Sequence, residues 1–220
     1  MSIYLLLYNL IQFFGWCCFF YKVTLGLINS KPLQEIFSNT HIILECCQYG
    51  AFLEIIHAII GIVKTSILPT TLQISVRIAI VVLLQFIPGS LSYGYLLIYF
   101  AWSSIEMVRY IYYALNLIKK DFNNFNIPYL LIWCRYSFFV VLYPIGTAGE
   151  MMTIWNSQKH FSKYILWKNK DFSISVAELF YPLYILYIPA LIFMYGYLFK
   201  QRKKVLNRLY YDKIKIKKNE

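Results

Sequence analysis

The sequence predicts an all-α polytopic membrane protein, built as a bundle of about six transmembrane helices. Hydrophobic residues make up 60% and aromatic residues 20% of the 220 residues, more than a soluble domain of this length carries. The mean hydropathy of +0.55 agrees with this. Several windows also reach the length of about 20 apolar residues that a helix needs to cross a hydrocarbon layer of about 30 Å. Membrane lipid is therefore the expected surrounding of the chain.

Six such windows follow one another along the sequence. The first has Lys22 as its only charge, which can reach the interface, and it lacks a basic leader and a small-residue cleavage site. We therefore expect it to be an uncleaved span. The second is less apolar because it holds Glu45, Glu54 and His57. The expected spans are Ile3–Leu27, Ile42–Val63, Leu72–Ile87, Leu91–Ile118, Ile127–Ile154 and Leu179–Phe199.

The later spans differ in their charges and in their prolines. The third has Arg77 near one end and stops at the turn sequence PGS. The fourth carries Glu106 and Arg109, and the fifth contains the sequence PIG, followed by a glutamate. The sixth has no charge, but Pro182 and Pro189 should kink it.

The basic residues predict the orientation of the bundle. The segment Lys200–Glu220 holds nine of the 21 Lys and Arg residues against two acids, which places it in the cytosol. With six spans the N-terminus lies there too, and the linker Asn156–Glu178 is lumenal, although its four lysines argue against that side. A re-entrant or interfacial piece would resolve this conflict. We expect one six-span transmembrane domain, residues 1–199, and a basic tail, residues 200–220. The net charge of +11 then reflects topology and anionic lipid, not nucleic acid.

Several kinds of active site are excluded by what the sequence lacks. The three histidines are dispersed, so no cluster can hold iron, and Glu54 with His57 is a polar contact between helices more readily than half of a di-iron site. No cysteine is followed by arginine at the phosphatase spacing, and no Gly-rich phosphate loop is present. We expect no metal and no cofactor. The cysteines all lie in apolar spans, where packing is their expected role: Cys17, Cys18, Cys46, Cys47 and Cys134.

Polar residues inside the spans are the remaining candidates for function. Glu106 and Arg109 are three residues apart on one helix face and can neutralise each other. Tyr136, Tyr143 and Glu150 follow at intervals of seven, which places them on one face of an unbroken helix. Such residues can join helices, but Glu150 has no basic residue three or four positions away. A carboxylate in hydrocarbon without such a partner favours general acid–base chemistry over a structural role.

Four segments occur in the order and spacing of a known family. They are YLLLYNLIQFFGW, LEIIHAIIGIVKTSILPTTLQISVR, AWSSIEMVRYIYYAL and RYSFFVVLYPIGTAGE. Over these segments, from Tyr4 to about Ile154, the chain resembles the very-long-chain 3-hydroxyacyl-CoA dehydratase family, also called the protein-tyrosine-phosphatase-like A family. The resemblance implies a six-span protein of the endoplasmic reticulum that converts 3-hydroxyacyl-CoA to trans-2-enoyl-CoA, the third step of fatty-acid elongation. It also implies that Tyr143 and Glu150 are the catalytic pair.

This chemistry needs a base for the C2 proton and an acid for the hydroxyl that leaves C3. Glu150 suits the base and Tyr143, protonated at neutral pH, suits the acid, but the sequence leaves the opposite assignment open. An ideal helix separates the two Cα atoms by about 10.5 Å. We therefore expect Pro144 and Gly146 to bend or unwind the helix, and a freed amide near Gly146 or Thr147 would face the thioester oxygen.

The CoA part of such a substrate should lie at the cytosolic face. Candidates for its phosphates are Arg109, Arg135, Lys119 and Lys120, and Tyr136 and Gly146 complete the expected binding residues. Other elongation enzymes are the expected protein partners, and the acyl chain length that the site prefers is not determined by the sequence. Lys217 and Lys218 have the spacing of a dilysine retrieval signal. The alternative to an enzyme is a non-catalytic scaffold of the elongation complex or a small transporter.

Overall fold

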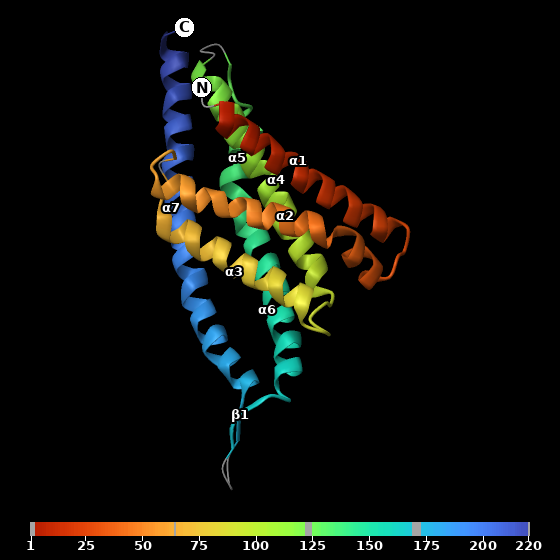
Figure 1. The fold of residues 1–220 in the computed structure, drawn as a ribbon. Helices are drawn as coiled ribbons and strands as arrows, with labels where there is room; N and C mark the ends of the chain where they lie inside the picture. The colour runs from red at the N-terminus through yellow and green to blue at the C-terminus, as the bar shows by residue number, and fades with distance from the viewer. Residues whose placement is uncertain (1–2, 64, 122–124, 169–172, 220) are drawn as a thin grey trace.

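The computed structural model describes residues 3–63, 65–121, 125–168 and 173–219, with side chains as far as residue 209. The described residues are helical apart from connections and one small antiparallel sheet, which confirms the predicted all-α class (Figure 1). The elements are α1 (Ile3–Ile28), α2 (Leu33–Ile59), α3 (Ile67–Phe86), α4 (Gly94–Asp121), α5 (Tyr129–Ser137), α6 (Phe139–Phe161), β1 (Ile165–Lys168), β2 (Ser173–Ser175), the 3-10 helix η1 (Val176–Phe180) and α7 (Tyr181–Asn219).

The helices make the chain a multi-pass membrane protein. Among the described residues, α1, α2, α3 and the stretch Val176–Leu209 are long and apolar enough to cross a membrane. α5 and α6, which are bent by 42° where they meet, make a fifth crossing if they count as one span. α4 has 28 residues, about 42 Å at about 1.5 Å per residue, but its buried Ser103 and Glu106 make it more polar. A sixth crossing by α4 stays a prediction.

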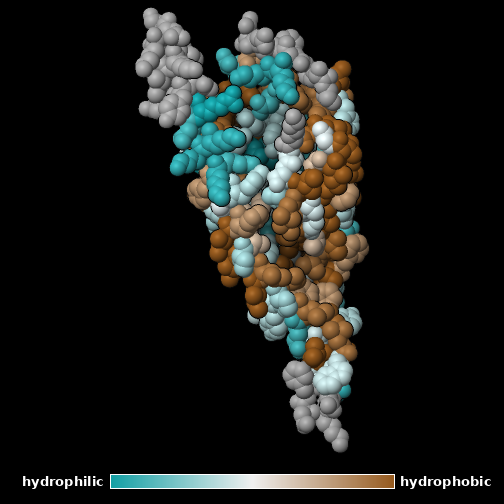
Figure 2. Space-filling view, turned by 90° about the vertical axis from the view of Figure 1, so that its left-hand side faces the viewer, coloured by the Kyte–Doolittle hydropathy of each residue, from teal (hydrophilic) through white to brown (hydrophobic). Residues whose placement is uncertain are grey.

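The two ends of the bundle differ in chemistry. Both termini and the connection between α4 and α5 lie at one end, and the hairpin of β1 and β2 projects from the other (Figure 1). Hydrophilic side chains gather at the end with the termini, and hydrophobic ones predominate over the middle of the molecule (Figure 2). Both termini on one side agree with an even number of crossings.

The linker after α6 forms structure that the sequence pattern did not predict. β1 and β2 pair antiparallel, with Trp167 opposite Ile174, and η1 leads from them into α7. The side chains of Leu166 and Trp167 are 55% and 52% exposed. Exposed aromatic and aliphatic side chains beside lysines are typical of the membrane interface, so the hairpin suits an interfacial piece better than a re-entrant one.

Two glycines let α4 and α6 approach closely. A β-carbon at Gly149 would lie 2.6 Å from the Gly94 carbonyl oxygen, and one at Gly94 would lie 2.8 Å from the Gly149 carbonyl oxygen. Backbones can approach so closely only where the side chains are small. The neighbouring Glu150 is thereby held against α4.

The helix break expected at Pro144 and Gly146 is wrong. α6 runs from Phe139 to Phe161 with Pro144 inside it, and the bend lies earlier, at Phe138 between α5 and α6. α7 likewise continues through Pro189 as one gently curved helix (Figure 1). Pro182 lies in the first turn of α7, where a missing N–H removes no helical hydrogen bond.

Candidate active site

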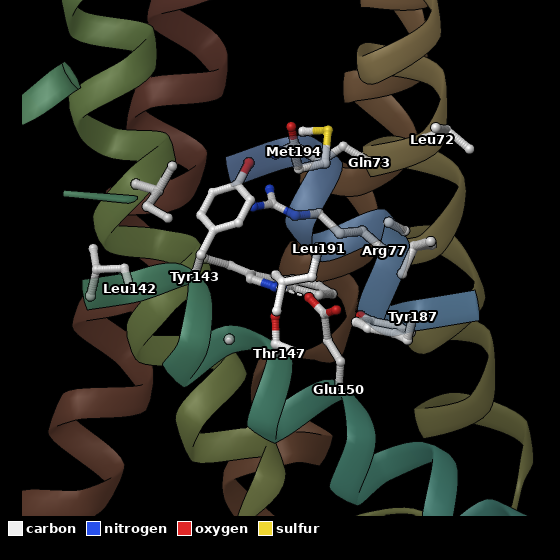
Figure 3. Close-up of a pocket in the computed structure, with 15 residues that line it drawn as sticks. Leu72, Gln73, Arg77, Leu142, Tyr143, Thr147, Glu150, Tyr187, Leu191 and Met194 are labelled. Carbon is white, nitrogen blue, oxygen red and sulfur yellow. Dashed lines mark hydrogen bonds between the residues drawn. The ribbon is translucent and has the colours of Figure 1, made fainter. Parts of the chain in front are cut away.

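Glu150 is a buried carboxylate, and one side chain among the described residues donates a hydrogen bond to it. Its side chain projects from α6 and the residue is 9% exposed. The indole Nε1 of Trp102, on α4, donates to Glu150 Oε1 at 2.9 Å (Figure 3). One neutral hydrogen bond orients a carboxylate without neutralising it. The group therefore remains able to accept a proton.

Tyr143 and Glu150 line the same cavity, of about 130 Å³. They lie two turns apart on α6, with Thr147 between them, and Figure 3 shows the carboxylate of Glu150 pointing into the space below the ring of Tyr143. Gly146 also lines it. The structure thus brings together both predicted catalytic residues and one predicted binding residue, on an unbroken helix.

Tyr136 lies apart from Tyr143 and Glu150. It lies on α5, before the bend at Phe138, where its ring meets Tyr112 edge-on at 5.9 Å between centroids and Arg135 lies over it at 5.6 Å. It does not line the cavity of Tyr143 and Glu150 or the two neighbouring cavities that Arg109 lines. The predicted common face therefore holds for Tyr143 and Glu150 alone.

Arg77 is a site residue, although the sequence marks it only as a charge in the third span. It extends from α3 into the cavity toward Tyr143 (Figure 3), lies 5.0 Å over the ring of Trp102, and donates to Glu106 on α4. The rule that charges inside spans are functional candidates would have marked it. Trp102 gave no such signal, because a tryptophan in an apolar span is unremarkable.

A buried ionic network continues from Arg77 toward the end of the bundle with the termini. Arg109 pairs with Glu106 at 2.7 Å, as predicted, and with Glu54 on α2, also at 2.7 Å. Tyr110 donates to the same Glu54 oxygen at 2.5 Å. Arg109 therefore has Glu54 as one acidic partner and shares the other, Glu106, with Arg77.

Glu54 and His57 each contact a different helix. His57 Nε2 lies 2.8 Å from the hydroxyl of Tyr4 on α1, and Glu54 bonds to α4. The pair thus makes polar contacts between helices, as predicted. In the described part of the chain no group of three potential metal ligands occurs, and all five cysteines are free.

A second, larger cavity of about 370 Å³ lies beside the first, and Gln73 and Met194 line both. Arg109, Arg135 and Lys120 line it, whereas Lys119 does not. Arg135 donates to the Tyr113 hydroxyl at 2.9 Å, and among the described residues no carboxylate lies within ion-pair distance of it. This cavity therefore offers a cation without an acidic partner, which suits an anionic ligand.

Comparison with known proteins identifies relatives of this chain. A family model described as "Protein tyrosine phosphatase-like protein, PTPLA" matches residues 48–208. The very-long-chain (3R)-3-hydroxyacyl-CoA dehydratase hpo-8 of Caenorhabditis elegans is 34% identical over 92% of this chain and 94% of its own length. A probable dehydratase of the same name in Schizosaccharomyces pombe is 33% identical over 93% of each chain. The human very-long-chain (3R)-3-hydroxyacyl-CoA dehydratase 2 is 29% identical over 93% of this chain and 81% of its own. No solved structure is significantly similar.

Proposed function

The chain belongs to the protein tyrosine phosphatase-like (PTPLA) family, and from this premise we propose that it dehydrates long-chain 3-hydroxyacyl-CoA to trans-2-enoyl-CoA in the third step of fatty-acid elongation. Its relatives in nematode, yeast and human carry the dehydratase name over nearly the whole of this chain. The observation that carries the proposal is the shared cavity of Tyr143 and Glu150, because a dehydratase needs one proton acceptor and one proton donor facing the same substrate.

The reaction follows from these two groups. The Glu150 carboxylate takes the proton from C2, the electron pair forms the C2–C3 double bond, and the C3–O bond breaks. The Tyr143 hydroxyl gives its proton to the departing oxygen, so that water leaves. Return of the proton from Glu150 to the phenolate restores the site. The opposite assignment, with Tyr143 serving C2, uses the same geometry.

Negative charge develops on the thioester oxygen as the C2 proton leaves, and it needs a partner. A freed amide at Gly146 or Thr147 is not supported, because α6 is helical there. Arg77 is the charged donor that lines this cavity beside Tyr143 and Glu150. A cation fixed there by Glu106 would stabilise the enolate without having to reorganise.

The second cavity is where we place the phosphates of the CoA part. Arg135 and Lys120 line it near the end of the bundle that holds the termini, and Arg135 lacks an acidic partner among the described residues. Arg109 contributes less, since it already pairs with two carboxylates. Lys119 and Tyr136 line neither cavity, so we assign them no contact with the phosphates.

The decisive experiment incubates the purified protein in detergent with 3-hydroxystearoyl-CoA and follows the 2-enoyl product. We expect turnover without added metal or cofactor. A folded sample that binds the substrate and forms no product would favour the non-catalytic scaffold instead. The reverse reaction, hydration of the enoyl-CoA, should be catalysed by the same preparation.

The expected setting is the endoplasmic reticulum membrane, with a six-span catalytic unit over residues 1–199 and the basic residues 200–220 in the cytosol beside other elongation enzymes. α7 continues across the boundary at residue 200, so composition and not a break in structure separates the two parts. Lys217 and Lys218 lie beyond the described side chains.

Replacing both Lys217 and Lys218 with Ser tests the retrieval signal in this tail. We expect part of the protein to move to later secretory compartments, while turnover in isolated membranes stays normal. Fluorescence microscopy with compartment markers measures the distribution. A wholly reticular distribution would mean that the two lysines do not act as a retrieval signal.

A further inference from the structure

The cavity that holds Tyr143 and Glu150 is too small for the substrate of the proposed function, on which this inference rests. Its volume is about 130 Å³. Cavities that enclose a drug-sized ligand measure about 300–1,000 Å³, and a long acyl chain is no smaller than such a ligand. The thioester and the first carbons fit, so the rest of the chain must leave the cavity.

The inner walls of the cavity offer no way out for the chain. Trp102 on α4 is 2% exposed, and Leu142 and Glu150 on α6 are 7% and 9% exposed. Behind these residues lies the close contact between α4 and α6 at Gly94 and Gly149. The chain cannot pass between these two helices.

The second cavity is also unsuited to an acyl chain. The side chains that line it include the charged groups of Glu54, Arg109, Arg135 and Lys120. Placing methylene groups beside charges displaces the water or the anion that would otherwise solvate them. This direction is therefore the one for the polar CoA part.

A further side lies between α3 and α7, and there several lining residues are exposed. Leu72 and Val76 on α3 are 44% and 37% exposed although they line the cavity, and Ala190 on α7 is exposed too. Tyr187, Leu191 and Met194 on α7 and Gln73 on α3 also line this side (Figure 3). Apart from the Gln73 amide and the Tyr187 hydroxyl, the side chains named here are apolar.

The surface around this opening is apolar and uncharged, as expected where a protein contacts lipid. Leu186, Ile188 and Ile192 on α7 are 64%, 62% and 66% exposed, and α7 has no charged residue between Tyr181 and Phe199. Viewed from the side of α7, hydrophobic side chains predominate over the middle of this face (Figure 2). An exposed apolar surface of this kind in a multi-pass protein faces hydrocarbon.

We propose that the gap between α3 and α7 is a lateral portal, through which the acyl tail of the substrate extends from the catalytic cavity into the bilayer. The protein then holds the CoA part, the thioester and the first carbons, and lipid solvates the remaining methylene groups. The cavity consequently sets no upper limit on chain length. Product leaves by the same path, with its tail already in the membrane.

Narrowing the portal tests this arrangement. Val76→Trp and Ala190→Trp each place an indole in the gap, and Val82→Trp is the matched control, because Val82 lies on the same helix at 39% exposure and does not line the cavity. In nanodiscs, kcat/KM is measured for 3-hydroxybutyryl-CoA and 3-hydroxystearoyl-CoA. We expect kcat/KM of the portal variants to fall by about tenfold or more further with the stearoyl substrate than with the butyryl substrate, because only the longer chain has to pass the gap.

The outcomes separate the portal from the proposed function. A wild-type protein that dehydrates neither substrate overturns both. An active wild type whose portal variants lose activity equally with both substrates, or with neither, overturns the portal alone.

A second measurement does not depend on the variants folding. Wild-type protein in nanodiscs is irradiated with a 3-hydroxyacyl-CoA whose terminal carbon carries a diazirine. We expect adducts on phospholipid and on the exposed residues of α3 and α7. Adducts confined to α1 and α2 would place the tail inside the bundle and overturn the proposal.

Discussion

The hydroxyl of Tyr195, on α7, donates a hydrogen bond to the backbone carbonyl of Val140, on α6, at 3.2 Å. In a regular helix this carbonyl would accept from the amide of residue 144, but Pro144 has no N–H. α7 thus supplies the donor that proline withholds, and α6 stays helical through Tyr143 and Glu150. The Tyr195 ring also meets the Tyr143 ring edge-on, at 6.1 Å between centroids.

Tyr195→Phe should therefore destabilise the protein through Val140 and leave the ring contact with Tyr143 in place. We expect a loss of about 1 kcal/mol in the free energy of unfolding, since polar contacts between membrane helices are worth about 0.6–1.7 kcal/mol. In a Pro144→Ala background the alanine amide can reach the Val140 carbonyl, so the same change should cost less. Thermal unfolding of the four proteins in detergent measures this coupling.

Tyr181→Phe is the control for Tyr195→Phe, because Tyr181 lies on the same helix and is 55% exposed. It should leave unfolding unchanged. Equal losses for Tyr195→Phe with and without Pro144 would show that the hydroxyl does not act through the Val140 carbonyl.

These contacts show what a single sequence can and cannot predict here. Apolar length predicted the helices, and the charges inside them predicted the Glu106–Arg109 pair. The same rule selected Glu150, whose catalytic role stays a prediction. Pro144 predicted a break in α6 that does not occur, because Tyr195, more than fifty residues away, donates to the Val140 carbonyl. Periodicity within one helix carries no information about such a partner.

The same limit applies to the rest of the site. Trp102 and Arg77 reach Glu150 and Tyr143 from two other helices, and their order in the chain does not indicate which faces meet. The bend at Phe138 separates Tyr136 from Tyr143, and residues 129–143 contain no proline or glycine that would predict it. The segment of β1 and β2 was expected to hold a re-entrant or interfacial piece, but its lysines gave no sign that it pairs as a hairpin.

Gly146→Leu should now harm the protein through packing and not by straightening a helix. A β-carbon at Gly146 would lie 3.3 Å from the β-carbon of Ala101 and 3.7 Å from Trp102. A leucine there would push α4 away from α6 and carry the Trp102 indole from Glu150, so we expect a loss of about 1–3 kcal/mol in unfolding free energy together with lower kcat. Thermal unfolding and steady-state kinetics measure the two effects.

Gly146→Ala separates the two explanations for this glycine. It adds only the β-carbon and should cost little, and Ala101→Gly in the same protein should restore what is lost. If unwinding of α6 were required for catalysis, Gly146→Ala would lower kcat and Ala101→Gly would not restore it.

Arg135→Gln and Lys120→Gln should weaken binding of the CoA part and leave the chemistry unchanged. A hydrogen bond to a charged group is worth about 1.5–3 kcal/mol, so Arg135→Gln should raise KM by about tenfold or more, while the exposed Lys120 contributes less. Free CoA should inhibit both variants more weakly than the wild type. kcat should change little, because such binding is equal in the ground state and the transition state.

Lys119→Gln is the matched control for these two variants, since Lys119 neighbours Lys120 on α4 and does not line the second cavity. It should behave like the wild type. An unchanged KM and unchanged inhibition by CoA in Arg135→Gln would move the phosphate site elsewhere.

Glu150→Gln and Tyr143→Phe should each remove most of the activity and leave the fold intact. The amide oxygen of Gln can still accept from Trp102 Nε1, which lies 2.9 Å from Glu150 Oε1, but the group can no longer take a proton. Loss of general acid–base catalysis typically costs about 10²- to 10⁴-fold in rate. Thermal unfolding near that of the wild type, measured beside the turnover, separates this loss from a structural role in joining α4 and α6.

Hydrogen exchange at C2 then assigns the two roles. In deuterated buffer, Tyr143→Phe retains the base and should still exchange the C2 proton of bound 3-hydroxyacyl-CoA while forming little product, whereas Glu150→Gln should do neither. Mass spectrometry of the recovered substrate detects the exchange. The opposite pattern, with exchange in Glu150→Gln alone, would make the Tyr143 oxygen the group that serves C2 and Glu150 the acid for the leaving hydroxyl. Normal turnover by either variant would remove that residue from the chemistry.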